Sequence, residues 1–291
     1  MTRDDALSLR SLLFVPALSE PFVEKAHTRG ADAVIVDLED SIAPDAKARA
    51  RAALPGAVSR IAAHGLPVFV RVNNEPAHLA ADLEAAGASA ACGVFLPKAE
   101  DVAQVRQVSE RLHAAEHALG RPVGSIAMVL LLESPLAILR AGELAGCDPR
   151  AVALGFGSED YATVMGVRPT LEAMRVPAQL IAIAARALGL AGWGVAGSIA
   201  EFTDLELFGR MAAAAQQSGF TGSIAIHPKQ VAVINQVFGV SEEEAREAQE
   251  IVAAFDEALA QGKAAVAHKG RMLDIPVVAR ARLVLARARR P

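Results

Sequence analysis

Residues 126–133 read Ile-Ala-Met-Val-Leu-Leu-Leu-Glu, an unbroken apolar run that ends in a carboxylate. The run is much shorter than the roughly 18 apolar residues of a membrane-spanning helix. It also lacks the alternation of a strand with one face in water, so it predicts a strand buried on both faces, as in parallel sheets. A charged residue directly after such a strand would lie at the edge of the sheet.

The rest of the chain repeats this pattern. Eight strand candidates occupy residues 11–16, 33–38, 67–72, 93–97, 126–132, 151–156, 193–196 and 223–226. Helical patterns occupy residues 44–64, 75–87, 101–119, 136–144, 177–188, 205–217 and 230–238. This alternation predicts an α/β protein with a (β/α)8 TIM barrel, whose active sites lie at the C-terminal ends of the strands.

Two segments exceed what eight such units need. Residues 159–178 contain Gly166, Pro169 and Pro177 and predict a loop or a broken helix over the rim. After residue 239 the pattern changes to a helix from Ser241 to about residue 261, a polar link over residues 262–270, and a basic helix over residues 277–290. We therefore expect a barrel domain over residues 1–239 and a C-terminal helical extension over residues 240–291, either a lid or an arm onto a neighbouring subunit.

The composition excludes several functional classes. Lys and Arg total 29 against 33 Asp and Glu, without the basic excess of a nucleic-acid-binding protein. Aromatic residues make up 4% of the chain, too few for base-stacking platforms. The 2 cysteines form no disulfide framework or metal-ligand spacing. With no signal peptide or membrane span in the sequence, we expect a cytoplasmic protein with neither a nucleic-acid nor a membrane partner.

Two carboxylates at neighbouring strand ends form a candidate metal site. Glu133 and Asp160 follow the fifth and sixth strands, so they would face the same volume. Two carboxylates completed by water and substrate oxygens suit Mg²⁺. Alternatively, Glu133 caps the next helix and Asp160 is a solvated surface residue.

A second charged group follows the second and third strands. Asp37, Glu39 and Asp40 require a cationic partner, and Arg71, at the end of the next strand, is one candidate. The planar guanidinium of Arg71 matches a carboxylate or an enolate oxygen. A purely structural ion pair between Arg71 and these acids is the alternative, as is a helix-capping role for Asp40.

Three further residues have open roles. Lys98 ends the fourth strand, where an electrostatic or structural role is favoured over a Schiff base. His227 could act as an acid, a base or a ligand, or be a hydrogen-bonded structural residue. Asp274 lies in the tail before Pro276 and could be a turn residue. No dinucleotide-binding, Walker or nucleophile-elbow motif is present.

A series of short motifs runs in order along nearly the whole chain: Arg10-Ser11-Leu12-Leu13-Phe14-Val15-Pro16, Val36-Asp37-Leu38-Glu39-Asp40-Ser41, Arg71-Val72-Asn73, Pro97-Lys98, Glu133, Gly157-Ser158-Glu159-Asp160, Ile226-His227-Pro228-Lys229-Gln230 and Gly270-Arg271-Met272-Leu273-Asp274. This series resembles the citrate lyase beta-subunit-like proteins and the malyl-CoA and citramalyl-CoA lyases of the HpcH/HpaI aldolase superfamily.

The resemblance implies a role for each matching residue. Glu133 and Asp160 match the ligands of Mg²⁺, and Arg71 matches the arginine that polarises a carbonyl or enolate oxygen. Asp37, Glu39 and Asp40 match acids that hold metal-bound water and orient Arg71, and Asp37 and Glu39 would be catalytic. Asp274 matches a tail aspartate that reaches an adjacent subunit as an acid/base. The resemblance places the remaining residues in substrate or coenzyme A binding: Arg10, Asp40, Pro97, Lys98, His227 and Pro228.

The implied activity is the Mg²⁺-dependent cleavage of a 3-hydroxyacyl-CoA, such as citramalyl-, malyl- or citryl-CoA, into acetyl-CoA and a 2-oxo acid, or the reverse reaction. A homo-oligomer, trimer or hexamer, is implied as well. Two alternatives are an acyl-CoA thioesterase on the same scaffold and a non-catalytic protein that binds CoA or a metabolite. The sequence departs from the pattern at Ala196, where many relatives carry an aspartate.

Overall fold

The computed structural model describes residues 1–288. The chain divides into two compact units, Met1–Asn235 and Gln236–Pro291, each with its own hydrophobic cluster. The first unit contains eight strands, as the sequence analysis predicts, although the seventh, expected at residues 193–196, lies at Ala191–Trp193. The second unit contains the C-terminal helices.

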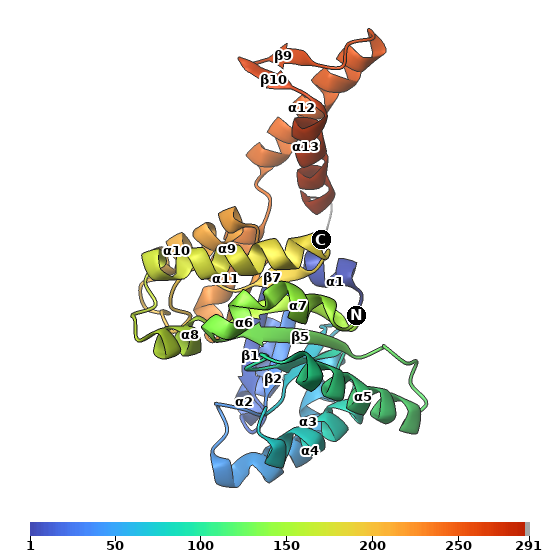
Figure 1. Cartoon of the computed structure of the whole chain (residues 1–291), viewed down its shortest axis with the longest axis vertical. Helices are drawn as coiled ribbons and strands as arrows, with labels where there is room; N and C mark the ends of the chain where they lie inside the picture. Colours follow the sequence, from blue (N-terminus) through green and yellow to red (C-terminus); the bar gives the residue numbers. More distant parts are fainter. Residues whose placement is uncertain (289–291) are drawn as a thin grey trace. The chain divides into compact units, whose positions relative to one another are not determined.

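Unit 1 is a barrel of parallel strands surrounded by helices (Figure 1). Its strands are β1 (Ser11–Pro16), β2 (Ala33–Asp37), β3 (Val68–Arg71), β4 (Gly93–Leu96), β5 (Ala127–Leu132), β6 (Ala151–Phe156), β7 (Ala191–Trp193) and β8 (Ser223–Ala225). They pair in the order β7-β6-β5-β4-β3-β2-β1-β8, and a parallel bridge between Trp193 and Gly222 brings the two edges together. The predicted (β/α)8 barrel is confirmed.

The helices of unit 1 are α1 (Arg3–Ser8), α2 (Glu20–Lys25), α3 (Lys47–Ala62), α4 (Pro76–Gly87), α5 (Val102–Ala118), α6 (Pro135–Leu139), α7 (Ala141–Gly146), α8 (Ser158–Met165), α9 (Leu171–Ala187), α10 (Leu205–Ser218) and α11 (Pro228–Phe238). Two short 3₁₀ turns, η1 (Ala26–Thr28) and η2 (Pro44–Ala46), precede β2 and α3. The long link after β6 is a broken helix, because Gly166 ends α8 in the left-handed conformation with a φ of 66°. Helix α9 then starts six residues before Pro177, which it accommodates in its interior.

Aromatic side chains fill the barrel interior. Phe69 meets the edge of Phe95 at a centroid distance of 5.4 Å, and Phe95 stacks on Trp193 at 6.0 Å. All three side chains are fully buried. The interior of the barrel is therefore packed rather than hollow.

Unit 2 contains α12 (Glu242–Ala260), β9 (Val266–His268), β10 (Arg271–Leu273) and α13 (Ile275–Ala288). Ser241 and Glu244 form a capping box that starts α12. β9 and β10 form an antiparallel hairpin where the sequence analysis expected a polar link, and Phe255, Leu273 and Val278 form the small core. The last helix was expected to reach residue 290, but residues 289 and 290 lie outside the described part. Within residues 1–288, no helix combines the length and hydropathy needed to cross a membrane.

One buried ion pair ties α5 to the start of β6. Arg150 donates from Nη2 to Glu116 Oε2 at 2.7 Å and from Nη1 to Oε1 at 2.8 Å, and both side chains are buried. Burial alone would raise the pKa of Glu116, but Arg150 and two backbone N–H donors lower it to about 2. The stabilisation is therefore present above the ordinary pKa of Glu116 and is lost as the pH falls toward 2.

Replacing Arg150 with Met would leave the Glu116 carboxylate buried without its cation. We expect the free energy of unfolding to fall by about 3–5 kcal/mol. The double variant R150M/E116Q should recover much of that loss, because it removes the uncompensated charge and keeps an acceptor for Ile126 N. Denaturant unfolding of the three proteins at pH 7 measures this, and equal losses in the single and double variants would contradict it.

Candidate active site

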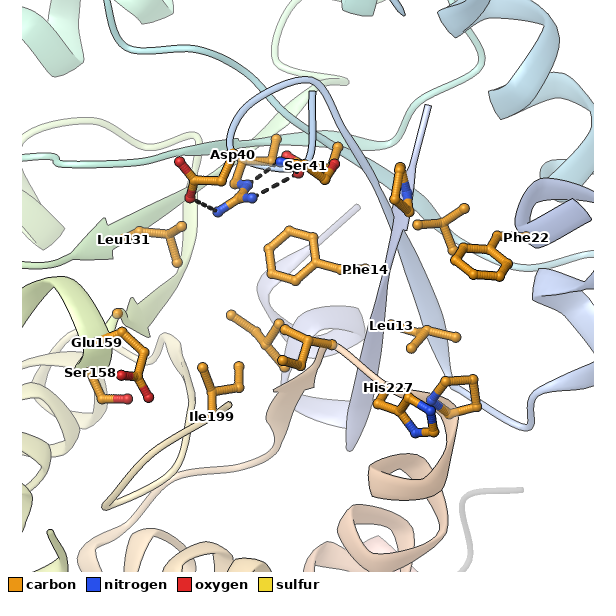
Figure 2. A pocket seen from close by; sticks show the side chains of 18 of the residues that line it. Leu13, Phe14, Phe22, Asp40, Ser41, Leu131, Ser158, Glu159, Ile199 and His227 are labelled. Carbon is orange, nitrogen blue, oxygen red and sulfur yellow. Dashed lines mark hydrogen bonds and ion pairs between the residues drawn. The ribbon is translucent and has the colours of Figure 1, made fainter. Parts of the chain in front are cut away.

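A cavity of about 800 Å³ opens at the C-terminal ends of the barrel strands. Its lining combines apolar side chains from β1 and β8 with charged side chains that follow β2, β3, β5 and β6. Figure 2 shows Phe14 in the middle of the view, with Asp40 and Ser41 above it, Ser158 and Glu159 on one side, and Phe22 and His227 on the other. The cavity therefore joins an apolar region to a charged one.

The Asp37–Arg71 ion pair forms the cationic side of this cavity. The parallel register places Asp37, the last residue of β2, directly opposite Arg71, the last residue of β3. Arg71 donates from Nε to Asp37 Oδ1 at 2.6 Å and from Nη2 to Oδ2 at 2.8 Å. Burial alone would raise the pKa of Asp37, but the guanidinium lowers it below its ordinary value. Asp37 is thus a permanent anion that fixes the plane of Arg71.

The remaining contacts of Arg71 restrict it further. Its Nη1 lies 3.1 Å from both Glu39 Oε2 and Asp40 Oδ2, and its guanidinium carbon lies 4.5 Å from the centroid of the Phe14 ring. Such an arrangement combines charge-assisted hydrogen bonds in the plane with a cation–π contact on one face. Lys98 Nζ contacts the other oxygen of Glu39 at 2.9 Å. Burial nevertheless raises the pKa of Glu39 above its ordinary value.

The electrostatic environment of Glu133 shifts its pKa in the opposite direction from that of Asp37. Its carboxylate is buried directly after β5, and its Oε2 accepts a hydrogen bond from the backbone N–H of Lys98 at 2.7 Å. Burial, followed by repulsion from Asp160 and Glu39, raises the pKa of Glu133 to about 8. The N–H and the ammonium of Lys98 lower it, but burial and the two acids outweigh them. When Glu133 and Asp160 are both ionised, the cations among the described residues therefore do not fully compensate their negative charge.

The surroundings of this pair fit a hard divalent cation. A Cβ at Gly157 would lie 2.6 Å from Glu133 Oε1, so only glycine leaves room for that carboxylate. The buried Oγ of Ser158 has no hydrogen-bond partner among the described residues and also lines the cavity. Within residues 1–288 no three His, Cys, Asp or Glu side chains assemble into a metal site. Two carboxylates that leave the other positions to water and substrate are what Mg²⁺ accepts.

Of the other predicted residues of the barrel, His227, Pro228 and Pro97 lie at the C-terminal ends of the strands, and Arg10 does not. His227 and Pro228 line the cavity, and His227 stacks on Phe202 at a centroid distance of 4.9 Å. Pro97 is buried directly after β4. Arg10 is not brought to this rim: it precedes β1, at the opposite ends of the strands, and donates from Nε and Nη2 to the Asp32 carboxylate at 2.9 and 2.8 Å.

Asp274 belongs to unit 2. Its Oδ1 accepts a hydrogen bond from Val277 N at 3.1 Å, which caps the first turn of α13. The carboxylate is thus fixed with respect to that helix, as the turn interpretation expected. This contact leaves its predicted acid/base role untested.

Three contributors to the site escaped the sequence analysis. Phe14 under Arg71 was recorded only as part of a strand motif, although alternate residues of β1 must point into the barrel. Gln230, fully buried, accepts from Ile226 N and His227 N and donates to Ile199 and Glu201 carbonyls, which fixes two rim loops. Glu159 accepts a hydrogen bond from Ser198 Oγ, which joins the start of α8 to the loop after β7 that also contains the apolar Ala196.

Comparison with known proteins finds relatives that match nearly the whole chain. Citrate lyase subunit beta of Leuconostoc mesenteroides is 31% identical over 279 residues, which cover 95% of this chain and 92% of the relative. L-malyl-CoA/beta-methylmalyl-CoA lyase of Cereibacter sphaeroides is 32% identical over 302 aligned residues, covering 96% and 94%.

Among solved structures, the protein CitE from Mycobacterium tuberculosis in complex with magnesium, acetoacetate and coenzyme A superposes with a TM-score of 0.78. It is 29% identical, and the match covers 97% of this chain and 99% of that one. The family model of HpcH/HpaI aldolase/citrate lyase matches residues 10–228. The resemblance is confirmed, and the chain belongs to the HpcH/HpaI aldolase/citrate lyase family.

Proposed function

We propose that this chain is a Mg²⁺-dependent carbon–carbon lyase that cleaves or forms a 3-hydroxyacyl-CoA, with acetyl-CoA and a 2-oxo acid on the other side of the reaction. The observation that carries the proposal is the juxtaposition, around one cavity, of the incompletely compensated Glu133–Asp160 pair and the immobilised Arg71. The L-malyl-CoA/beta-methylmalyl-CoA lyase of the same family is named for its action on CoA thioesters, and the M. tuberculosis structure contains magnesium and coenzyme A.

The cavity also suits a CoA thioester in size and chemistry. Phe22, Ile199 and Ile226 supply apolar lining, and Arg29 and Lys229 add two cationic side chains. Cations beside an apolar wall match the phosphates and the alkyl arm of coenzyme A. His227 and Pro228 would lie along the same approach, at the end of β8.

Glu133 and Asp160 would hold the cation, which when bound supplies Lewis-acid polarisation of the oxo-acid oxygens. During cleavage the substrate hydroxyl loses its proton, the bond between the α and β carbons breaks, and its electron pair moves to the thioester oxygen. Arg71, fixed by Asp37 and Phe14, would stabilise the negative charge of that enolate. Asp274 would move the proton, and the enolate takes up a proton to give acetyl-CoA.

We further propose that Asp274 acts on the barrel of a neighbouring copy, which requires a homo-oligomer. In unit 2, Met272 and Ile275 flank this position with exposed apolar side chains. Such residues are typical of surfaces that dock onto another protein. A cytoplasmic location is in keeping with the two free cysteines.

The activity can be tested directly. Incubation with malyl-, citramalyl- and citryl-CoA and Mg²⁺ should release acetyl-CoA and a 2-oxo acid from at least one of them. R71K should lower kcat by about 10²–10³-fold, because lysine cannot reproduce the bidentate geometry. Separation of the products by mass decides the reaction class. Free CoA with an intact hydroxy acid would instead identify a thioesterase, and no turnover by protein that binds Mg²⁺ would refute the lyase.

Cation binding at Glu133 should change the thermal stability of the protein. Its raised pKa means that the ionised carboxylate destabilises the folded chain, increasingly as the pH rises from about 4.5 to 8, unless a cation is bound. In EDTA at pH 8.5, E133Q should therefore raise the Tm by a few degrees, with a much smaller effect at pH 5.

The same variant should abolish the Tm increase that Mg²⁺ gives the parent protein. The control E100Q changes a carboxylate that lines only the neighbouring smaller cavity and should retain the Mg²⁺ response. A parent-like Mg²⁺ response in E133Q would contradict the assignment.

Subunit complementation tests the role of Asp274. R71A and D274N should each be inactive, yet equal random mixing of the two should restore about one quarter of all sites, because an intact barrel then meets an intact neighbouring tail at that frequency. Co-expression with two affinity tags isolates the mixed species. If tag-verified mixed oligomers remain inactive, Asp274 does not act between subunits.

A further inference from the structure

Lys98 has a backbone conformation that a side chain normally disfavours. Its φ is 50°, and within residues 1–288 only one other non-glycine residue, Lys269, has a positive φ. A left-handed residue with a side chain is strained, and such strain persists where the surrounding structure holds it, often at functional sites. The position directly after β4, at the rim of the barrel, is such a place.

This conformation lets one residue contact three neighbouring strand ends. The N–H of Lys98 donates to Glu133 Oε2 at 2.7 Å, after β5, and its carbonyl accepts from Asn74 Nδ2 at 3.2 Å, after β3. Its ammonium donates to Glu39 Oε1 at 2.9 Å, after β2. Asn74 is held in turn by Gln104, whose Nε2 donates to Asn74 Oδ1 at 2.5 Å.

The side chain approaches the charged cluster from outside the main cavity. Lys98 lines a second cavity of about 510 Å³, together with Asn74, Gln104 and the Glu133–Asp160 pair. The carboxylate pair lines both cavities, whereas Lys98 is not among the described residues around the larger one. This placement separates the ammonium from the volume that would hold the thioester.

Glu39 is the group on which the ammonium acts. One oxygen of Glu39 faces Arg71 Nη1 at 3.1 Å, and the other faces Lys98 Nζ at 2.9 Å. Without Lys98, Arg71 would be the one cation among residues 1–288 that contacts the buried carboxylate of Glu39, and this carboxylate would compete with Asp37 and with substrate for that guanidinium. Lys98 therefore satisfies Glu39 and leaves Arg71 in its Asp37-bound orientation.

We propose that Lys98 is a positioning residue, whose ammonium acts through Glu39 to hold Arg71 in place for catalysis. Its effect on turnover rests on the proposed lyase function, but its electrostatic effect on the carboxylate pair does not. A positive charge beside Glu133 and Asp160 repels a divalent cation, so its removal should strengthen cation binding.

The test compares kcat with direct Mn²⁺ binding, the latter followed by electron paramagnetic resonance of the free ion at pH 8.5. K98M should lower kcat about tenfold or more with little change in KM, while Mn²⁺ binds about threefold more tightly or better. K98R should retain most of the turnover, because it restores the cation. A residue that merely supported the fold would weaken turnover and Mn²⁺ binding together.

A second variant separates charge from backbone strain. K98G removes the ammonium, keeps the N–H to Glu133 and relieves the left-handed strain, so its Tm should be higher than that of K98M, which loses the same ion pair but keeps the strain. It should nevertheless lose turnover as K98M does. K269G is the matched control for stability, because Lys269 also has a positive φ, 46°, and an ion pair, 2.5 Å to Glu250.

The outcomes distinguish the positioning role from the proposed reaction. Parent-like turnover in K98M, or weaker Mn²⁺ binding in K98M and K98G, would overturn the role of Lys98. If the parent protein cleaves no thioester, the lyase proposal fails, and the Mn²⁺ titration still decides the electrostatic claim: tighter binding at unchanged Tm supports it, and weaker binding refutes it.

Discussion

The ion pair between Asp37 and Arg71 is the interaction on which the rim of this barrel depends. Parallel pairing brings the last residues of β2 and β3 side by side, so two charged groups can be buried with two hydrogen bonds between them. Breaking such a pair leaves an uncompensated buried charge, which costs far more than the pair itself contributes. The contacts of Glu39, Asp40 and Phe14 then all converge on a guanidinium whose plane is already set.

The carboxylates around the cavity divide into two electrostatic classes. Asp37 has a lowered pKa, because it is bound to a cation of the protein itself. Glu133 has a raised pKa, because burial and neighbouring acids leave it without an adequate cation. Titratable groups that their environments drive in opposite directions are a feature of active sites. Asp37 therefore provides a charge that orients Arg71, whereas Glu133 and Asp160 are available to bind an added cation.

The architecture could be predicted because buried parallel strands leave a strong sequence signal. Each run is apolar without alternation, and its first charged residue marks the rim, as Glu133 and Asp37 do. The hairpin β9–β10 escaped prediction because its short strands are mostly not buried and so lack the apolar run that marks the strands of the barrel.

The geometry within the rim was less accessible from sequence. Nothing in the residue type of Lys98 indicates a positive φ, since neighbouring strand ends impose that conformation. The contact between Phe14 and Arg71 depends on the register between strands. Arg10 belongs to a recognisable motif, yet it precedes its strand and so lies at the other end of the barrel from the cavity.

A crystal structure of the protein with Mg²⁺ and a 2-oxo acid would test the central claim most directly. The account predicts a cation bound by the carboxylates of Glu133 and Asp160, an oxo acid on that cation, and Arg71 still paired with Asp37 at the edge of the same cavity. A cation bound elsewhere, or an oxo acid placed without contact to that cation, would contradict it.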